Sequence, residues 1–145
     1  MRIIQDSITK TVCATVIHGC NNKGTFGAGV AKAVAQKWPE AKEAYLQHFQ
    51  RWDGNPPLGS HSRAIVSGKS IFNLITQDGY GRDGKKYARY WAIIIGLNKI
   101  AYDEPEIAIP RIGCGFGGLD WNIMEKLLLE FENDFDVEFW VYDPS

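Results

Sequence analysis

The sequence predicts an α/β fold with a largely parallel or mixed sheet that helices cover on both faces. Segments rich in β-branched residues alternate with segments whose apolar residues recur at helical spacing. Two of the strand segments, 11–17 and 106–109, each run into a glycine-rich loop and then into a helical segment. The 145 residues are 45% hydrophobic, which is enough apolar material for one core. We therefore expect a single domain over residues 1–145.

The first half of the chain is predicted to hold four strands and two helices. TVCATVI, at 11–17, is rich in β-branched residues and predicts a buried strand. A helix from Val30 must end at Trp38, because a residue that precedes a proline avoids the α conformation. Pro39 suits the first turn of a second helix, which is expected to end near Trp52. Short strands are predicted at 2–5, 64–67 and 70–75.

The second half begins with a polar segment, QDGYGRDGKK at 77–86, which predicts a mobile surface loop that could gate a pocket. Apolar positions at helical spacing then predict a helix over 87–102. A short strand at 106–109 precedes the second glycine-rich loop, PRIGCGFGGL. Asp120 is a good N-cap for a helix that runs to about Glu132, and the last strand is predicted at 137–142.

Composition excludes several classes of protein. With 16 basic and 17 acidic residues the net charge is −1, so no basic face for bulk nucleic acid is expected. Three cysteines without a CxxC pair predict neither a disulfide framework nor a zinc site. No apolar run reaches the length of a membrane span, and the N-terminus lacks the apolar region of a signal peptide. We expect a cytoplasmic monomer that needs no metal and no cofactor.

The two glycine-rich loops are the segments that indicate a ligand. Their glycines are Gly24, Gly27 and Gly29 in the first loop, and Gly113, Gly115, Gly117 and Gly118 in the second. Parallel strands bring such loops to the carboxyl edge of the sheet, where glycine lets backbone N–H groups approach a phosphate. A plain tight turn is the alternative for either loop alone. The second loop also matches the G-x-G-x-x-G pattern, but too little chain follows it for a dinucleotide-binding dehydrogenase domain.

Both loops resemble those of a known family. HGCNNKGTFGAGVAKAVAQKWP is similar to the first binding loop and helix of macrodomains, and IPRIGCGFGGLDW is similar to their phosphate-facing loop. The spacing resembles the branch that contains ADP-ribose 1″-phosphate phosphatases and terminal ADP-ribose protein glycohydrolases. The resemblance extends from Arg2 to Pro144. It implies a three-layer α/β/α sandwich with a central mixed sheet, and ADP-ribose or ADP-ribose 1″-phosphate as the ligand.

The resemblance also assigns binding residues. Asp6 would accept a hydrogen bond from the adenine amino group, and Asn21 would contact the hydroxyls of the distal ribose. Phe116 would pack beside that ribose, while Tyr142 either lines the adenine pocket or belongs to the core. The remaining ligand contacts implied are Ser7 and Ile8 near the adenine, Gly27, Ala28, Gly29 and Val30 around the ribose and phosphates, and Gly113, Cys114, Gly115 and Gly117 along the diphosphate.

The resemblance implies catalytic roles for His18, Asn21 and Asp120. A histidine near a terminal phosphate could orient water, and a carboxylate beside the phosphate loop could act as a base. His18 packed in the core and Asp120 acting only as a cap are the alternatives. The glycohydrolases use a lysine where this chain has Gln77 and an aspartate where it has Gly117. We therefore expect hydrolysis of ADP-ribose 1″-phosphate to ADP-ribose and phosphate.

Other activities remain open from the sequence. One alternative is a hydrolase that removes ADP-ribose from modified protein or nucleic acid, and another is a reader that binds ADP-ribose without turnover. A scaffold with a degenerate pocket is disfavoured by the intact glycines. Catalysis by the Cys114 thiol is also disfavoured, because no histidine follows it at a recognisable spacing.

Overall fold

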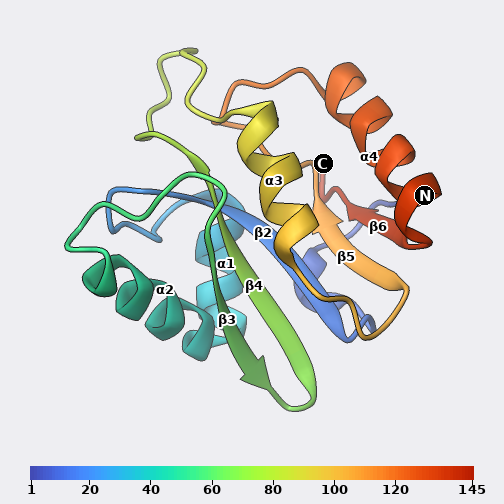
Figure 1. The fold of residues 1–145 in the computed structure, drawn as a ribbon, viewed down its shortest axis with the longest axis horizontal. Helices are drawn as coiled ribbons and strands as arrows, with labels where there is room; N and C mark the ends of the chain where they lie inside the picture. The colour runs from blue at the N-terminus through green and yellow to red at the C-terminus, as the bar shows by residue number, and fades with distance from the viewer.

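Six strands form one mixed sheet in the computed structural model, which describes residues 1–145 (Figure 1). The strand order is β1-β6-β5-β2-β4-β3, and only β3 runs antiparallel to its neighbour. The strands are β1 (Arg2–Ile4), β2 (Thr15–Asn21), β3 (His61–Val66), β4 (Lys69–Gln77), β5 (Glu106–Pro110) and β6 (Glu138–Tyr142). The tight turn at Ser67 and Gly68, both with positive φ, explains the antiparallel β3–β4 hairpin.

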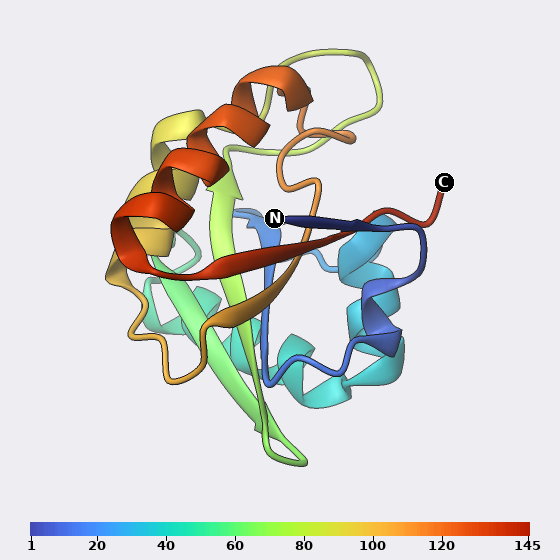
Figure 2. The same ribbon diagram turned by 90° about the vertical axis from the view of Figure 1, so that its right-hand side faces the viewer.

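Helices cover both faces of this sheet (Figure 2). They are η1 (Ile8–Lys10), α1 (Gly29–Lys37), α2 (Pro39–Arg51), α3 (Tyr90–Lys99) and α4 (Trp121–Phe135). Side chains of β2 alternate between two cores: Val16 packs with α1 and α2, whereas Ile17 packs with α3 and α4. The predicted three-layer α/β/α sandwich with a mixed sheet is therefore confirmed. None of the helices has the length and hydropathy that crossing a bilayer requires.

The boundaries of the second strand differ from the prediction. The ladder starts at Thr15 and runs to Asn21, whereas TVCATVI predicted a strand over 11–17. Before Thr15 the chain leaves η1, and the side chain of Lys69 donates hydrogen bonds to the carbonyl groups of Thr11 and Cys13. These carbonyls are thus satisfied by an amine rather than by a neighbouring strand. The later end of β2 carries His18 into the interior of the sheet.

The third helix is shorter than the predicted 87–102. Residues 87–89 are extended, and the N–H groups of Tyr87 and Ala88 both donate to the Gly117 carbonyl oxygen, at 2.9 and 3.0 Å. The Arg89 N–H donates to the Thr76 carbonyl oxygen at 3.0 Å. Because these backbone groups bond to other segments, α3 begins only at Tyr90.

Candidate functional site: the cleft between two glycine-rich loops

Two adjacent parallel strands place both glycine-rich loops at the same edge of the sheet. β2 pairs with β5 through Thr15–Ile107 and Val16–Ala108, so their carboxyl ends point the same way. The first loop, residues 22–28, connects β2 to α1 on one face of the sheet. The second loop, residues 111–120, connects β5 to α4 on the opposite face. The two loops therefore diverge from neighbouring strand ends and leave a hollow between them.

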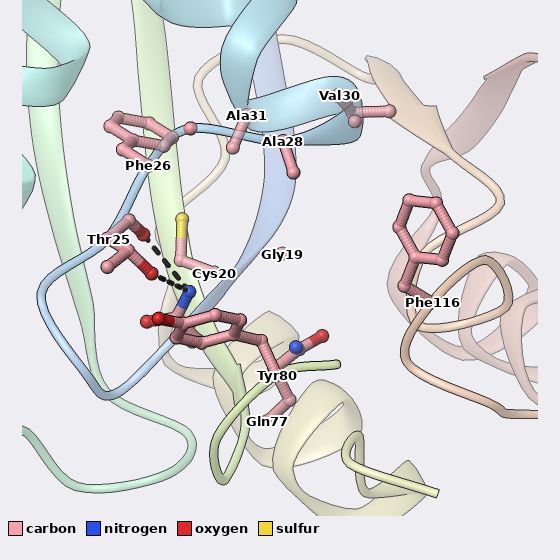
Figure 3. Close-up of a pocket in the computed structure, with 13 residues that line it drawn as sticks. Gly19, Cys20, Thr25, Phe26, Ala28, Val30, Ala31, Gln77, Tyr80 and Phe116 are labelled. Carbon is pink, nitrogen blue, oxygen red and sulfur yellow. Dashed lines mark hydrogen bonds between the residues drawn. The ribbon is translucent and has the colours of Figure 1, made fainter. Parts of the chain in front are cut away.

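This hollow is a cavity of about 350 Å³ with residues from both loops in its wall. Residues 19–21 and 25–31 form one side, and Phe116 of the second loop lies across the cavity from Thr25 (Figure 3). Gln77 and Tyr80 close it from the end of β4. An adjoining hollow of about 100 Å³ shares wall residues with the first and adds Gly113, Gly115 and Gly117. We call the two together the cleft, and its size is ordinary for a small-molecule site.

Glycine is required in the cleft for two different reasons, which Gly29 and Gly117 illustrate. Gly29 begins α1 with a φ of +59°, a conformation that side chains with a Cβ rarely adopt. A Cβ on Gly117 would lie 2.6 Å from the carbonyl oxygen of Gly113, so the second loop could not close on itself. By contrast, a Cβ on Gly27 or on Gly115 would meet no atom within 4 Å. These last two glycines leave open space beside the cleft.

Both loops offer backbone N–H groups to the cleft, and Arg111 also lines its smaller hollow. Ala28 occupies the N-cap of α1 and supplies no side-chain acceptor, so the first-turn N–H groups of this helix have no cap. In the second loop, the N–H groups of Gly115, Phe116 and Gly117 donate to no acceptor within the protein. The uncapped end of α1 also carries a partial positive charge. Such an arrangement binds an anion, above all a phosphate, without any basic side chain.

Asn21 lies where β2 ends and the first loop begins. The register between β2 and β4 shifts between Cys20 and Asn21, which takes Asn21 out of the regular ladder. Its Nδ2 donates to the Thr25 carbonyl oxygen at 3.0 Å and to Thr25 Oγ1 at 2.9 Å (Figure 3). Its Oδ1 accepts the Lys23 N–H at 2.8 Å. The amide therefore fixes the path of the first loop while lining the cleft.

The polar segment 78–88, here called the strap, joins the two loops. At one end Asn22 donates to Asp78 Oδ1 at 3.1 Å and accepts the Gly79 N–H at 3.0 Å. At the other end, residues 87 and 88 bond to the second loop as described above. A Cβ on Gly118 would lie 2.8 Å from the Lys85 carbonyl oxygen, so the strap and the second loop are also in close contact. The predicted mobile loop is thus tethered at both ends, and Figure 2 shows it arching over the second loop.

The strap and the second loop each place an exposed aromatic ring at the mouth of the cleft. Tyr80 is 56% exposed and Phe116 is 51% exposed, and both line the cavity. The guanidinium of Arg82 lies 4.8 Å from the centre of the Phe116 ring, in cation–π geometry. The mouth is therefore apolar and planar on two sides, with one positive charge beside it.

We compared the sequence and the structure of the chain with those of known proteins. No protein-family model matches the chain. A DNA ADP-ribosyl glycohydrolase of Mycobacterium bovis is 28% identical over 90% of this chain, which spans 38% of that protein's length. An ADP-ribose 1″-phosphate phosphatase of Saccharomyces cerevisiae is 25% identical over 92% of this chain and 91% of the yeast protein. Among solved structures, a macrodomain protein from Streptomyces coelicolor matches with a TM-score of 0.78, 26% identity and coverage of 98% and 97%.

The chain is a macrodomain relative. In this macrodomain fold the predicted loop residues come together as follows. Asn21 and the segment from Gly27 to Val30 line the larger cavity opposite Phe116. Gly113, Gly115 and Gly117 line the smaller hollow beside it. Cys114 lines neither, because its thiol points to the Ile112 carbonyl oxygen at 3.4 Å. Burial raises the pKa of this thiol to about 11, so it is protonated at neutral pH.

His18 lies away from the cleft, inside the macrodomain core. The strand predicted at 11–17 stopped just before His18, whereas His18 is fully buried in the middle of β2. Its Nε2 lies 2.6 Å from Asn73 Oδ1, and its ring stacks on Phe26 at 5.3 Å. Burial lowers the pKa of His18 to about 4, although the Asn73 bond opposes this shift. A neutral, enclosed imidazole supports the packed-histidine interpretation.

The other predicted residues lie outside the cleft wall. Asp6, Ser7 and Ile8 form the turn into η1: Asp6 accepts the Ser7 N–H at 2.8 Å and pairs with Lys10 at 3.3 Å. The Ser7 side chain caps η1, and Ile8 is buried. Asp120 caps α4 by accepting the Asn122 N–H at 2.8 Å. Tyr142 is 6% exposed and belongs to the core beside α1 and α2.

Sequence reasoning gave no ligand contact to several residues of the cleft, among them Tyr80, Thr25 and Gln77. Tyr80 was included only in a surface loop, although an aromatic side chain among glycines and charges, in YGRDG, was a signal for a binding surface. Thr25 was part of the first loop without a role, and its contact with Asn21 has no sequence signature. Gln77 was noted only for not being lysine, yet it lines both hollows of the cleft.

Proposed function

We propose that the cleft binds ADP-ribose and that the chain hydrolyses ADP-ribose 1″-phosphate to ADP-ribose and phosphate. One observation carries the binding proposal: two sets of unpartnered backbone N–H groups, from the start of α1 and from residues 115–117, border one cleft. A pyrophosphate presents several anionic oxygens on adjacent phosphorus atoms, so it can accept bonds from both loops at once. The yeast relative named for this phosphatase activity matches over almost its full length.

The chemistry of such a hydrolysis must rest on orientation. The polar side chains in the wall of the larger cavity are those of Asn21, Thr25, Gln77 and Tyr80, and no carboxylate, imidazole or lysine is among them. In the proposed reaction water attacks the terminal phosphorus and the bond from phosphorus to the 1″ oxygen breaks. The proton that the water loses passes to the 1″ oxygen, which leaves as the ribose hydroxyl, and phosphate is the other product. Amide side chains orient the water and the ribose, and N–H groups stabilise charge on the phosphoryl oxygens. Without a strong base, we expect slow turnover.

Removal of ADP-ribose from a modified macromolecule is the second candidate. The exposed rings of Tyr80 and Phe116 and the charge of Arg82 at the open mouth favour it, because a bulky group on the distal ribose would emerge there. The mycobacterial relative carries a name of this kind. Gln77 stands where the resemblance implies a lysine nucleophile, so a water-based route would be required.

One set of assays separates these functions. The purified chain is incubated with ADP-ribose 1″-phosphate and, separately, with an ADP-ribosylated oligonucleotide, while phosphate and free ADP-ribose are measured. Release of phosphate and ADP-ribose from ADP-ribose 1″-phosphate, with the oligonucleotide left intact, supports the phosphatase. Release of ADP-ribose from the oligonucleotide alone supports the second candidate. Binding of ADP-ribose in a calorimeter without either product identifies a reader. No binding of any of these compounds would refute the proposal.

A matched pair of variants ties the activity to the cleft. Gly27→Val adds a side chain to open space beside the cleft without requiring an unusual φ. We expect it to weaken ADP-ribose binding by about tenfold or more, which corresponds to 1.4 kcal/mol. Ala101→Val also introduces a valine side chain, at an exposed position outside the cleft, and should leave binding unchanged. Equal affinity of the two variants would contradict the location of the site.

A further inference from the structure

Tyr45, on α2, is a fully buried residue whose polar contacts all go to the first loop. Its side chain is 0% exposed. The hydroxyl donates to the Asn21 carbonyl oxygen at 2.8 Å and lies 3.1 Å from Asn21 Oδ1. It accepts the Gly24 N–H at 3.0 Å. A single oxygen from another element therefore bonds to both the first and the fourth residue of the segment 21–24.

The ring of Tyr45 supports the same loop further along. Its centre lies 5.1 Å from that of Phe26, and Phe26 in turn stacks on His18 of β2. Phe26 is 4% exposed and also lines the cleft. The hydroxyl thus holds residues 21 and 24, while the ring holds residue 26. Between these points lies Thr25, which accepts both hydrogen bonds from the Asn21 amide.

The backbone of the first loop needs this support. Gly24 has a φ of +83°. A Cβ added to Gly24 would lie 2.9 Å from the ring of Phe49, which is also on α2. Its N–H has no acceptor other than the Tyr45 hydroxyl. Without that oxygen, a partly buried N–H would lose its hydrogen bond, and the loop would shift to recover one from water. A shift at Gly24 moves Thr25 and Phe26, which are parts of the cleft wall.

We propose that Tyr45 is a positioning residue that presets Asn21 and the first loop for the ligand. Burial raises the pKa of Tyr45 to about 12, so the hydroxyl keeps its proton and its donor role at neutral pH. Because the first loop is already ordered before the ligand binds, less conformational entropy is lost on binding and the affinity is higher. The effect on ligand affinity rests on the proposed function, whereas the effect on the loop does not.

The test compares two tyrosines that each lose one hydroxyl that donates a hydrogen bond to a backbone carbonyl oxygen. Tyr45→Phe keeps the ring against Phe26 and removes the oxygen. Tyr102→Phe is the matched control, because the Tyr102 hydroxyl donates to the Leu97 carbonyl oxygen at the end of α3, away from the cleft. The Kd for ADP-ribose is measured well below the unfolding temperature of each variant. We expect Tyr45→Phe to raise this Kd about tenfold, while Tyr102→Phe binds like the parent chain. Equal affinity of all three proteins would overturn the proposal.

Two further measurements separate failure of this proposal from failure of the proposed function. Amide hydrogen exchange at Gly24 should accelerate in Tyr45→Phe and stay unchanged in Tyr102→Phe, whatever the ligand is. Unchanged exchange at Gly24 in Tyr45→Phe would overturn the positioning role. Faster exchange in this variant, together with a parent chain that does not bind ADP-ribose, would refute only the ligand. If Tyr45→Phe does not fold, Thr25→Val removes an acceptor of the Asn21 amide at an exposed site. It should also weaken binding, and an unchanged Kd would contradict the preset loop.

Discussion

Asp120 provides the sharpest test of whether a carboxylate takes part in the chemistry. It lies at the start of the second loop's helix, where either a base or a cap was expected from the sequence. In the structure its Oδ1 accepts the Asn122 N–H at 2.8 Å, and its φ and ψ of −86° and 120° are those of an N-cap. A side chain that serves only as a cap can be exchanged for serine, whereas a general base cannot.

The expected loss of stability follows from the cap. Asp120→Ala removes one acceptor at the start of α4, which costs about 1 kcal/mol. For a chain of 145 residues, an unfolding entropy of about 0.3 kcal/mol/K converts this loss into a fall in melting temperature of about 3 °C. Asp120→Ser keeps an acceptor oxygen and should recover most of that loss. We expect both variants to keep the parent affinity for ADP-ribose and the parent rate of hydrolysis.

The assay measures thermal unfolding and turnover on the same preparations. Loss of turnover in both Asp120→Ala and Asp120→Ser, with stability restored only in the serine variant, would establish a catalytic carboxylate and refute the view that Asp120 acts only as a cap. An unchanged melting temperature of Asp120→Ala would show that the N-cap hydrogen bond contributes no measurable stability. The Asp120 N–H donates to the Tyr90 hydroxyl in either variant, so that contact does not confuse the comparison.

Three further predictions concern the core and the strap. Burial lowers the pKa of His18 from 6.5 to about 4, so between these pH values His18 is protonated in the unfolded chain and neutral in the folded chain. The free energy of unfolding should therefore fall as the pH drops from 6.5 towards 4. His18→Gln should flatten that part of the pH profile, and an equally steep profile would contradict the assignment. Asn22→Ala removes two hydrogen bonds to the strap, one of them to Asp78, and should lower stability by about 1–2 kcal/mol and speed proteolysis of the strap. Gly118 has a φ of +82°, and the Cβ of Gly118→Ala would lie 2.8 Å from the Lys85 carbonyl oxygen. This variant should therefore lower the melting temperature, and an unchanged melting temperature would show that the contact between strap and second loop is loose.

The glycine loops were predictable because their signals are local. A β-branched run, several glycines and an amphipathic helix follow one another within about 25 residues in each case, and the parallel sheet brings their ends together. What the sequence could not supply were partners far along the chain. The start of β2 depends on Lys69, and the burial of His18 depends on Asn73, 55 residues away. Secondary-structure propensity depends on neighbouring residues in the sequence, so it cannot predict such contacts.

The site was predicted less completely than the fold for a related reason. Asp6 and Asp120 are short polar residues at turns, where an acceptor for a backbone N–H is needed whether or not a ligand is present. Both structural demands are met in the structure, by the Ser7 and Asn122 N–H groups. Residues that act through others, such as Tyr45, show no pattern at all, because helical spacing alone would place Tyr45 in the core.

The pairing of β2 with β5 also has a kinetic consequence. The pairing joins Thr15 to Ile107, so the strands that precede the two glycine-rich loops are separated along the chain by intervening elements that include β3, β4 and α3. Pairing of strands so remote in sequence is slow, because a long stretch of chain must be ordered first. A ligand that contacts both loops can therefore bind only after β2 and β5 have paired, so it stabilises the folded domain and gives no help to earlier steps of folding.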